Sequence, residues 1–481
     1  MNRKMVFSTL GQLTLSEAVL LIFPFITALI YRETKVAISF AITIGIALGL
    51  GLFLYLTFKT ENKLIFAKEG FVIVAFGWLI MSIIGAIPFV LSGDIPSFIN
   101  AFFETVSGFS TTGASILLDV ESLSHGGLFW RSFTHWIGGM GVLVFIMALL
   151  PSISDRSIHI MRAEMPGPIV GKIVPRAKET ARILYVIYLF ITLLEVVLLM
   201  IGKMDLFEAL IHSFGSVGTG GFGIKNDNIA SYSPYIQWVI IAFMFICGIN
   251  FNLFYLLLMK KFKDVFKSGE LWAYVGITLS AIVIICFNIS PLYNSISETI
   301  RVSAFQVSSI LTSTGYSTAS FNTWPSLSKT VLLLLMFIGG CAGSTAGGLK
   351  VARVVMFVKM IKQELRRIIH PRSVTTVKFE SKIVDKTTLS SVSSYLALFL
   401  VFFITILFII SFEPFDFEMN FSAALSCLNN NGAIFSSTSE TPSFASYSGF
   451  TKIILSLAML FGRLELYPLL IALSPSTWTK K

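Results

Sequence analysis

Charged residues are scarce in this chain: Asp, Glu, Lys and Arg make up 13% of its 481 residues, whereas 55% are hydrophobic. The mean hydropathy is accordingly high, at +0.81. A water-soluble protein of this composition would expose large apolar patches, so that class is excluded. The composition predicts a polytopic membrane protein. The net charge of +10 lies mainly in loops between apolar segments, so membrane orientation explains it and we expect no nucleic-acid partner.

Cysteine is also rare, and no CxxC motif occurs. The four cysteines lie far apart in the sequence, at Cys247, Cys286, Cys341 and Cys427. This spacing predicts small buried core residues and gives little support to a metal or redox role. The apolar segments contain almost no Asp, Glu or His, and no HExxH motif is present. Because an intramembrane enzyme needs such groups, we expect no enzymatic activity and no organic cofactor.

Apolar segments of about 20 residues, the length that a bilayer requires, predict an all-α fold with ten transmembrane helices. These segments are Leu13–Ile30, Val36–Leu56, Phe71–Leu91, Leu128–Leu150, Ile183–Ile201, Tyr235–Met259, Leu271–Phe287, the interrupted Val331–Ile361, Tyr395–Ile410 and Phe450–Leu473. The first two form an N-terminal hairpin in residues 1–68. The other eight pair into four repeats, which span residues 69–160, 161–266, 267–386 and 387–481.

Each repeat carries, between its two apolar segments, a stretch too polar to cross a membrane. The four stretches are FFETVSGFSTTGAS (102–115), ALIHSFGSVGTGGFG (209–223), AFQVSSILTSTGYST (304–318) and FSAALSCLNNNGAIFS (421–436). We align them on Gly113, Gly220, Gly315 and Gly432, each of which follows Thr or Asn. One Thr-Gly pair alone indicates a turn or a packing glycine. Four copies predict half-helices whose polar loops meet on one axis, as in a pore with a filter.

The residue types in these loops suit a dehydrated cation, because backbone carbonyls replace its water when they point at the axis. Glycine permits the required backbone dihedrals, and the negative end of each preceding half-helix favours a cation. No charged residue lies within three positions before any of the four glycines, so a monovalent cation is predicted. The predicted filter residues are Thr111, Thr112, Gly113, Gly218, Thr219, Gly220, Ser313, Thr314, Gly315, Asn430, Asn431 and Gly432.

Basic residues concentrate in the loops between repeats, which the positive-inside rule places in the cytoplasm. Both termini are therefore predicted to be cytoplasmic, and all four polar loops to enter from outside. Acidic residues on the outer side either raise the local cation concentration or form a solvated rim, and both interpretations remain open. All four repeats run in the same direction, which disfavours a solute carrier built from inverted repeats.

The last apolar segment of repeat three is interrupted by GGCAGSTAGG (339–348). A ten-residue glycine-rich break cannot face lipid, so it lines the cavity below the filter or is buried. We favour a gating loop over a closely packed helix kink. A phosphate-binding loop is disfavoured because no strand precedes it and no Walker pattern fits. The predicted gate residues are Gly339, Gly340, Gly343, Ser344, Thr345, Ala346, Gly347, Gly348, Lys350 and Arg463.

Arg463 follows an apolar run, and a charge at such a place is a functional candidate. A pair with Glu465, or extension of the side chain to the interface, is an equal alternative. For Lys350 the interface is the preferred interpretation. Glu104 and His212 lie in the predicted half-helices, where we expect them to act as packing or capping partners.

With these features the chain resembles the Trk/Ktr/HKT superfamily of potassium transporters. The resemblance rests on the fourfold repeat and on HWIGGMG (135–141), RAEMPGP (162–168), the 339–348 break and GRLE (462–465). It covers essentially the whole chain. The extra N-terminal hairpin is similar to the bacterial TrkH-type branch rather than to KtrB, which lacks it.

The resemblance implies a potassium uptake subunit of the bacterial inner membrane, with K⁺ as the transported ion. It also implies a homodimer, a cytoplasmic nucleotide-binding ring of the TrkA type, and a position for Arg463 beneath the filter. In the superfamily a serine at the first filter glycine accompanies sodium permeation, so Gly113 favours potassium. The alternatives are a sodium-coupled KtrB-like transporter and a less selective monovalent cation channel. The basic segment 361–386 either docks the ring or contacts membrane lipid headgroups.

Overall fold

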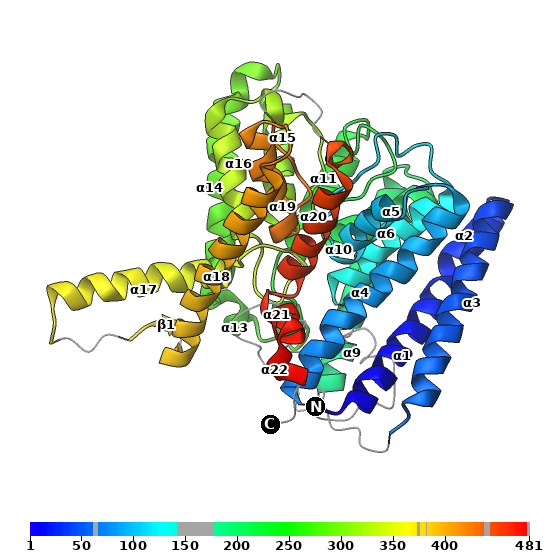
Figure 1. Ribbon diagram of the computed structural model, residues 1–481. Helices are drawn as coiled ribbons and strands as arrows, with labels where there is room; N and C mark the ends of the chain where they lie inside the picture. Colours follow the sequence, from blue (N-terminus) through cyan, green and yellow to red (C-terminus); the bar gives the residue numbers. More distant parts are fainter. Residues whose placement is uncertain (61–65, 142–176, 373–375, 381, 437–442, 479–481) are drawn as a thin grey trace.

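The N-terminal helices pack as a hairpin beside the rest of the chain in the computed structural model, which describes residues 1–60, 66–141, 177–372, 376–380, 382–436 and 443–478 (Figure 1). The hairpin consists of α1 (Arg3–Leu20), α2 (Ile22–Ile30) and α3 (Thr34–Thr57). Gly11 and Gly51 lie where α1 crosses α3, and a Cβ added to either would come within 2.8–3.1 Å of the other's carbonyl oxygen. Small residues therefore permit the close crossing of these two helices.

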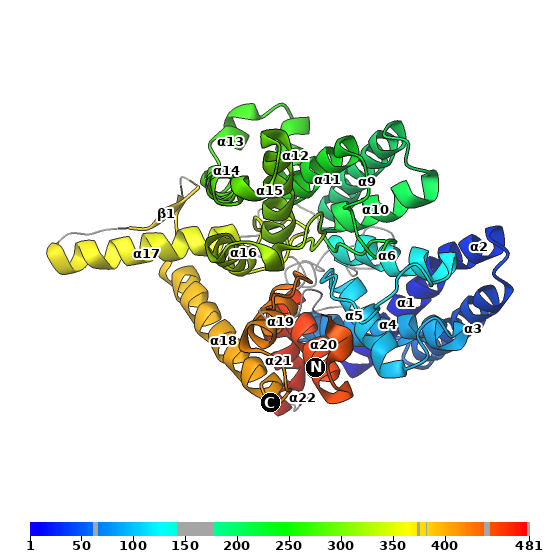
Figure 2. The ribbon, with the colours of Figure 1, turned by 90° about the horizontal axis from the view of Figure 1, so that it is seen from above.

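The remaining helices repeat one order four times: a long helix, a short helix and a further helix after a loop. The first repeat has α4 (Ala67–Ser92), α5 (Phe98–Phe109) and α6 (His125–Gly139), and the second has α9 (Ala177–Ile201), α10 (Leu206–Gly218), α11 (Pro234–Cys247), α12 (Phe251–Leu258) and α13 (Phe262–Phe266). The third has α14 (Gly269–Ile289), α15 (Ile296–Leu311), α16 (Ser326–Ile338) and α17 (Val351–Ile369). The fourth has α18 (Lys386–Ile410), α19 (Phe417–Asn429), α20 (Gly449–Arg463), α21 (Tyr467–Leu473) and α22 (Pro475–Trp478). Viewed from above, these four groups surround one centre, with α1–α3 outside them (Figure 2).

Side-chain caps fix where several of these helices begin. Ser124, Ser233 and Ser448 each accept a hydrogen bond from a backbone N–H of the first turn of α6, α11 and α20. Asp205 caps α10 in the same way, from Glu208 N at 3.2 Å. Such caps satisfy N–H groups that have no partner within the helix, so the sequence sets these helix starts locally.

Two of the spans predicted as single apolar segments are each built from two helices. Tyr235–Met259 is a bent pair, with 91° between α11 and α12, and Phe450–Leu473 is another, with 115° between α20 and α21. The first bend falls at the Gly248–Asn250 connection, and the second at Glu465 and Leu466, which both have positive φ. The sequence predicted such a break only in the third repeat, where α16 and α17 are indeed separate.

The count of ten transmembrane helices is not confirmed. Within the described residues, six helices are long and apolar enough to span a membrane, or up to eight if each bent pair counts as one span. Residues 142–150 of the predicted span Leu128–Leu150 lie outside the described part of the chain, as does the RAEMPGP motif. The fold is nonetheless that of an all-α polytopic membrane protein.

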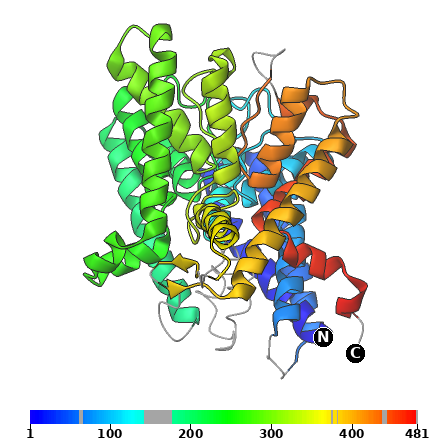
Figure 3. The ribbon, with the colours of Figure 1, turned by 90° about the vertical axis from the view of Figure 1, so that its left-hand side faces the viewer.

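One short antiparallel sheet, which the sequence did not predict, joins α17 to α18. It pairs β1 (Lys378–Phe379) with β2 (Lys382–Ile383), with Lys378 opposite Ile383. Three short 3₁₀ helices complete the elements: η1 (Ser290–Leu292), η2 (Phe321–Thr323) and η3 (Phe444–Ser446). Figures 1 and 3 show α17 running across the direction of α14 and α18, close to the sheet.

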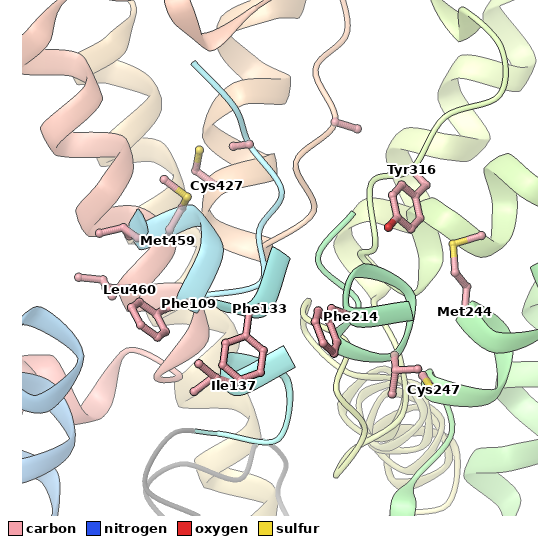
Figure 4. Close-up of a cluster of buried hydrophobic side chains, with 14 of the residues drawn as sticks. Phe109, Phe133, Ile137, Phe214, Met244, Cys247, Tyr316, Cys427, Met459 and Leu460 are labelled. Carbon is pink, nitrogen blue, oxygen red and sulfur yellow. The ribbon is translucent and has the colours of Figure 1, made fainter. Parts of the chain in front are cut away.

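The core is continuous around the centre and draws side chains from every repeat (Figure 4). Phe109 packs edge-on against Trp130, and Phe129 edge-on against Phe214, which joins the first repeat to the second. Three of the four cysteines are buried and Cys286 is half-buried, as expected for core residues. Large apolar side chains point outward from the long helices at Phe53, Phe190, Phe287 and Phe408, where lipid would cover them.

Candidate functional site

The four short helices α5, α10, α15 and α19 end in the same backbone conformation. The residues Thr111, Thr219, Ser313 and Asn430, which lie one or two positions after these helices end, have φ values of 54–55°, in the left-handed region. Residues other than glycine rarely adopt this region, so the fourfold recurrence is not a matter of chance. In each loop the following N–H then bonds the carbonyl five residues upstream, at 2.8–2.9 Å: Thr112 to Ser107, Gly220 to Gly215, Thr314 to Ser309 and Asn431 to Ser426.

This equivalence corrects our alignment of the second stretch by one residue. Gly113, Gly315 and Gly432 have φ values of 76–82°, and their counterpart in the second repeat is Gly221, with a φ of 76°. Gly220, which we had placed in register with them, occupies the position of Thr112. The sequence TGG at 219–221 offers two adjacent glycines, and only the backbone conformation distinguishes them.

The glycines Gly113, Gly221, Gly315 and Gly432 each pack against the backbone of the next repeat, and the four contacts form a closed cycle. A Cβ added to any of them would meet a carbonyl oxygen of the next repeat at a distance that real Cβ atoms do not show. The contacts run from Gly113 to Gly220 O, from Gly221 to Thr314 O, from Gly315 to Asn431 O, and from Gly432 to Thr112 O. The backbone of these eight residues, which we call the carbonyl ring, therefore encloses one axis.

Asn430 and Asn431 of the fourth stretch have a structural role that their sequence did not indicate. Asn430 Nδ2 donates to Thr112 Oγ1 at 2.9 Å and to Met459 O at 2.8 Å, which ties the fourth loop to the first. Asn431 Nδ2 donates to Ile310 O at 2.6 Å and ties it to the third. The amide side chains thus cross-link the carbonyl ring from one quadrant to the next.

A buried ion pair, which the sequence analysis did not predict, holds the chain segments that follow the carbonyl ring in the first and second repeats. Arg131 Nε contacts Glu104 Oε1 at 2.6 Å, and the two side chains are 3% and 0% exposed. Glu104 also accepts from Ser115 Oγ and Ile116 N, both at 2.9 Å, while Arg131 donates to Gly223 O at 3.0 Å. The pair therefore fixes the first and second loops where they leave the ring. A basic residue seven positions into an apolar helix is the signal that would have indicated it.

We expect Arg131→Met to lower the free energy of unfolding by about 3–5 kcal/mol, because it leaves the Glu104 carboxylate buried without its partner. The measurement is thermal unfolding of the purified protein in detergent. The matched control is Lys329→Met, whose ion pair with Glu418 is longer, at 3.5 Å, and more exposed. The control is expected to change stability by at most about 1 kcal/mol. Equal effects of the two substitutions would contradict the supporting role.

His212 joins the second and third repeats, so its expected packing role has a definite form. Its Nε2 lies 3.2 Å from the Tyr232 hydroxyl and its Nδ1 3.4 Å from the Tyr316 hydroxyl. Tyr316 in turn donates to His212 O and Phe222 O. Burial, followed by the nearby Glu208, raises the pKa of Tyr232, in the loop between α10 and α11, above its ordinary value, so that hydroxyl stays protonated.

The loop Gly339–Lys350 lies directly against the carbonyl ring and the other broken helices. Gly348 N donates to Asn429 O at 3.0 Å, and Gly347 N donates to Ser313 Oγ, so the loop reaches the ends of α19 and α15. Toward the second repeat, Cys341 N donates to Gly248 O at 2.9 Å and Thr345 Oγ1 donates to Cys247 O at 3.2 Å. The loop thus spans the space beneath the ring.

Arg463, from the fourth repeat, connects the loop to the first repeat. Its guanidinium is buried, with the residue 8% exposed, and donates to Thr345 O at 3.0 Å. The same group donates to the backbone carbonyls of Gly138 and Gly139, the latter at 2.7 Å, where α6 ends. Glu465, the alternative partner for Arg463, holds a bidentate pair with Arg353 at 2.6–2.9 Å.

Lys350 lies inside the protein rather than at an interface, in contrast to the preferred interpretation of its sequence. It is 2% exposed, has a φ of 76°, and donates from Nζ to Ala346 O in its own loop. This hydrogen bond links the last residue of the loop to a carbonyl four residues upstream, just before α17 begins. The predicted gate residues are therefore brought together, from Gly339 to Lys350 with Arg463.

The arrangement can hold a desolvated cation without any charged ligand. Four backbone carbonyls lie in one closed cycle of contacts, and four short helices, whose C-termini carry partial negative charge, end beside them. The glycine-rich loop and the buried Arg463 lie next to the ends of these helices. Fold and site together define an all-α polytopic membrane protein built from four repeats around a ring of backbone carbonyls.

Comparison with known proteins gives this class a family. The family model TrkH, described as a cation transport protein, matches residues 37–480. The Trk system potassium uptake protein TrkH of Escherichia coli K12 is 35% identical over 486 residues, covering 99% of this chain and 100% of that protein. TrkG of the same strain is 32% identical and covers 95% of this chain and 94% of that protein. The crystal structure of the potassium transporter TrkH from Vibrio parahaemolyticus superposes with a TM-score of 0.89 at 29% identity, over 100% of both chains. The chain belongs to the TrkH family.

Proposed function

We propose that this protein takes up potassium ions across the cell membrane, with the carbonyl ring as its selectivity filter. The observation that carries the proposal is the closed cycle of contacts among the four glycines and carbonyls. Backbone oxygens at such a constriction replace the water of a monovalent cation, and no carboxylate lies in the ring to favour a divalent one. The names of the relatives support potassium as the ion.

The loop Gly339–Lys350 acts as the gate in this proposal, and Arg463 holds it shut. In this conformation the loop bonds to α15, α19 and the α11–α12 connection at once, so the path below the ring is blocked. The positive charge of Arg463 beneath the ring also repels cations while the loop is closed. Opening requires these bonds to be exchanged together, which makes the loop a two-state element.

A regulatory ring of the TrkA type belongs to the proposal because the relatives are named as parts of a Trk system. The homodimer, contact with membrane lipid, the inner membrane and cytoplasmic termini stay predictions. The N-terminal helix and α22 do lie on one side, where Arg3 Nη2 donates to Trp478 O at 3.0 Å.

The proposal is tested by rubidium uptake into proteoliposomes that contain this protein alone, with potassium, sodium and lithium as competitors. We expect competition by potassium and little by sodium or lithium, because the ring replaces the hydration of the larger ions. Equal competition by all three would favour a less selective monovalent cation channel, and uptake that requires sodium would favour a sodium-coupled transporter. The same assay is repeated on protein with a shortened loop. Uptake by the shortened form alone would indicate that the pore of the full chain is closed, whereas no uptake in either form would contradict the proposal.

A further inference from the structure

A small apolar cluster separate from the main core joins the Gly339–Lys350 loop to the β1–β2 hairpin. It consists of Ala342 from the loop, Ala352 and Met356 from the start of α17, Phe379 from β1 and Val392 from α18. All five side chains are at most 6% exposed. Phe379 is the largest of them and comes from an element outside the predicted fold. Burial of this aromatic ring in the cluster that includes Ala342 stabilises the loop in its present position.

A second connection reaches the same loop residue through polar groups. Ala342 N donates to Glu270 Oε1 at 2.6 Å, and Glu270, in the first turn of α14, is 3% exposed. Ser268, the N-cap of that helix, donates from Oγ to Glu380 Oε1 at 3.0 Å. Glu380 directly follows β1 and has a φ of 48°. The hairpin, the start of α14 and the loop are therefore joined in one chain of contacts.

The hairpin is also fixed to the helix that continues the loop. Lys359 of α17 donates from Nζ to Lys378 O at 2.8 Å and lies 5.8 Å from the centre of the Phe379 ring. Val384 N donates to Val377 O at 2.9 Å and closes the base of the hairpin. Because α17 begins directly after Lys350, the hairpin is connected to the loop both through the apolar cluster and through the helix that continues the loop.

We propose that the β1–β2 hairpin is a latch that holds the gating loop closed, with Glu270 and Phe379 as its positioning residues. The inference rests on the proposed function of the loop as a gate, and it adds the element that controls it. Ala342 N donates to Glu270 Oε1, which holds its backbone, and its side chain lies in the same buried apolar cluster as the Phe379 ring. Withdrawal of the hairpin removes the Phe379 ring from this cluster and weakens the support of Glu270, so the loop is released.

The test is basal rubidium uptake into proteoliposomes by the full chain carrying Glu270→Ala or Phe379→Ala. Each is expected to raise uptake about tenfold, the change produced by about 1.4 kcal/mol in the balance between closed and open loop. Glu270→Gln keeps an oxygen that accepts from Ala342 N and is expected to stay near the unsubstituted rate. If the substitutions only disturbed the structure in general, potassium selectivity would fall as uptake changed. The latch predicts instead that uptake rises in the Ala variants, stays unchanged in Glu270→Gln, and that potassium selectivity is unchanged in all of them.

Matched controls come from the same side of the protein. Glu364→Ala removes a carboxylate that is 60% exposed, and Phe266→Ala removes a ring that is 61% exposed; neither contacts the loop. Both are expected to leave uptake unchanged. Glu380→Ala alters only the exposed end of the chain of contacts, so it keeps the proposal testable if the buried substitutions prevent folding, and we expect it to raise uptake about twofold to threefold.

The proposed function and the latch fail in different ways. Deletion of 343–347 is the reference for an open path. If that deletion conducts but Glu270→Ala, Phe379→Ala and Glu380→Ala all match the unsubstituted protein, the latch is wrong and the gate stands. If the deletion does not conduct either, the gate is wrong and the latch falls with it. In the deletion background Phe379→Ala is expected to add nothing, and a further increase there would overturn the latch.

Discussion

Deletion of Gly343–Gly347 is expected to raise basal rubidium uptake by about 10- to 100-fold, since a loop closed in about 99 molecules of 100 limits the open population to about one. The deleted residues include Thr345, which both Arg463 and the α11–α12 connection hold in place. They also include Gly347, which donates to Ser313 Oγ at the end of α15. Without them the loop is too short to reach all of these partners.

A milder change gives a matched control for this prediction. Thr345→Val removes a hydroxyl that bonds Cys247 O across two repeats, whereas Thr330→Val removes one that bonds Ser326 O within its own helix, at 2.8 Å. We expect the first to increase basal uptake severalfold, given about 1 kcal/mol for a lost hydrogen bond, and the second to leave it unchanged. Low uptake in the deletion variant and in Thr345→Val would contradict the gate.

Gly113→Ser is expected to lower the preference for potassium over sodium by about tenfold, corresponding to about 1.4 kcal/mol of lost discrimination at the ring. Gly113 has a φ of 76°, where side chains are strained, and its Cβ would meet the carbonyl oxygen of Gly220. The Gly220 carbonyl must therefore shift, and in the proposed filter it is one of the oxygens that replace the water of the ion. The measurement is competition of rubidium uptake by potassium and by sodium, and an unchanged ratio would contradict the role of Gly113.

The second loop tests the corrected register directly. A Cβ at Gly221 would meet the backbone carbonyl of Thr314, whereas one at Gly220 would meet the side chain of His135. Selectivity lost in Gly220→Ala is therefore expected to return when His135→Ala makes room, but selectivity lost in Gly221→Ala is not. Rescue of both, or of neither, would indicate that Gly221 is not the counterpart of Gly113.

The sequence by itself determined the class of protein and the place of the site. Apolar segments of spanning length, interrupted at four points by small polar residues before glycine, require those points to be buried and satisfied by one another. The same reasoning located the Gly339–Gly348 break, because ten glycine-rich residues cannot continue a helix in lipid. Local rules sufficed here, since period, length and glycine content act over short stretches of chain.

Only the tertiary structure decided what depends on contacts between distant residues. The bends after Cys247 and Arg463 are examples, because the local sequence there did not distinguish bent helix pairs from continuous spans. The choice of Gly221 over Gly220 is fixed by contact with Thr314, which lies in another repeat. The pairing of Arg131 with Glu104, and the burial of Phe379 in one cluster with Ala342, depend on the tertiary structure. A charge in an apolar helix predicts that a partner exists, but which residue it pairs with is set by the fold.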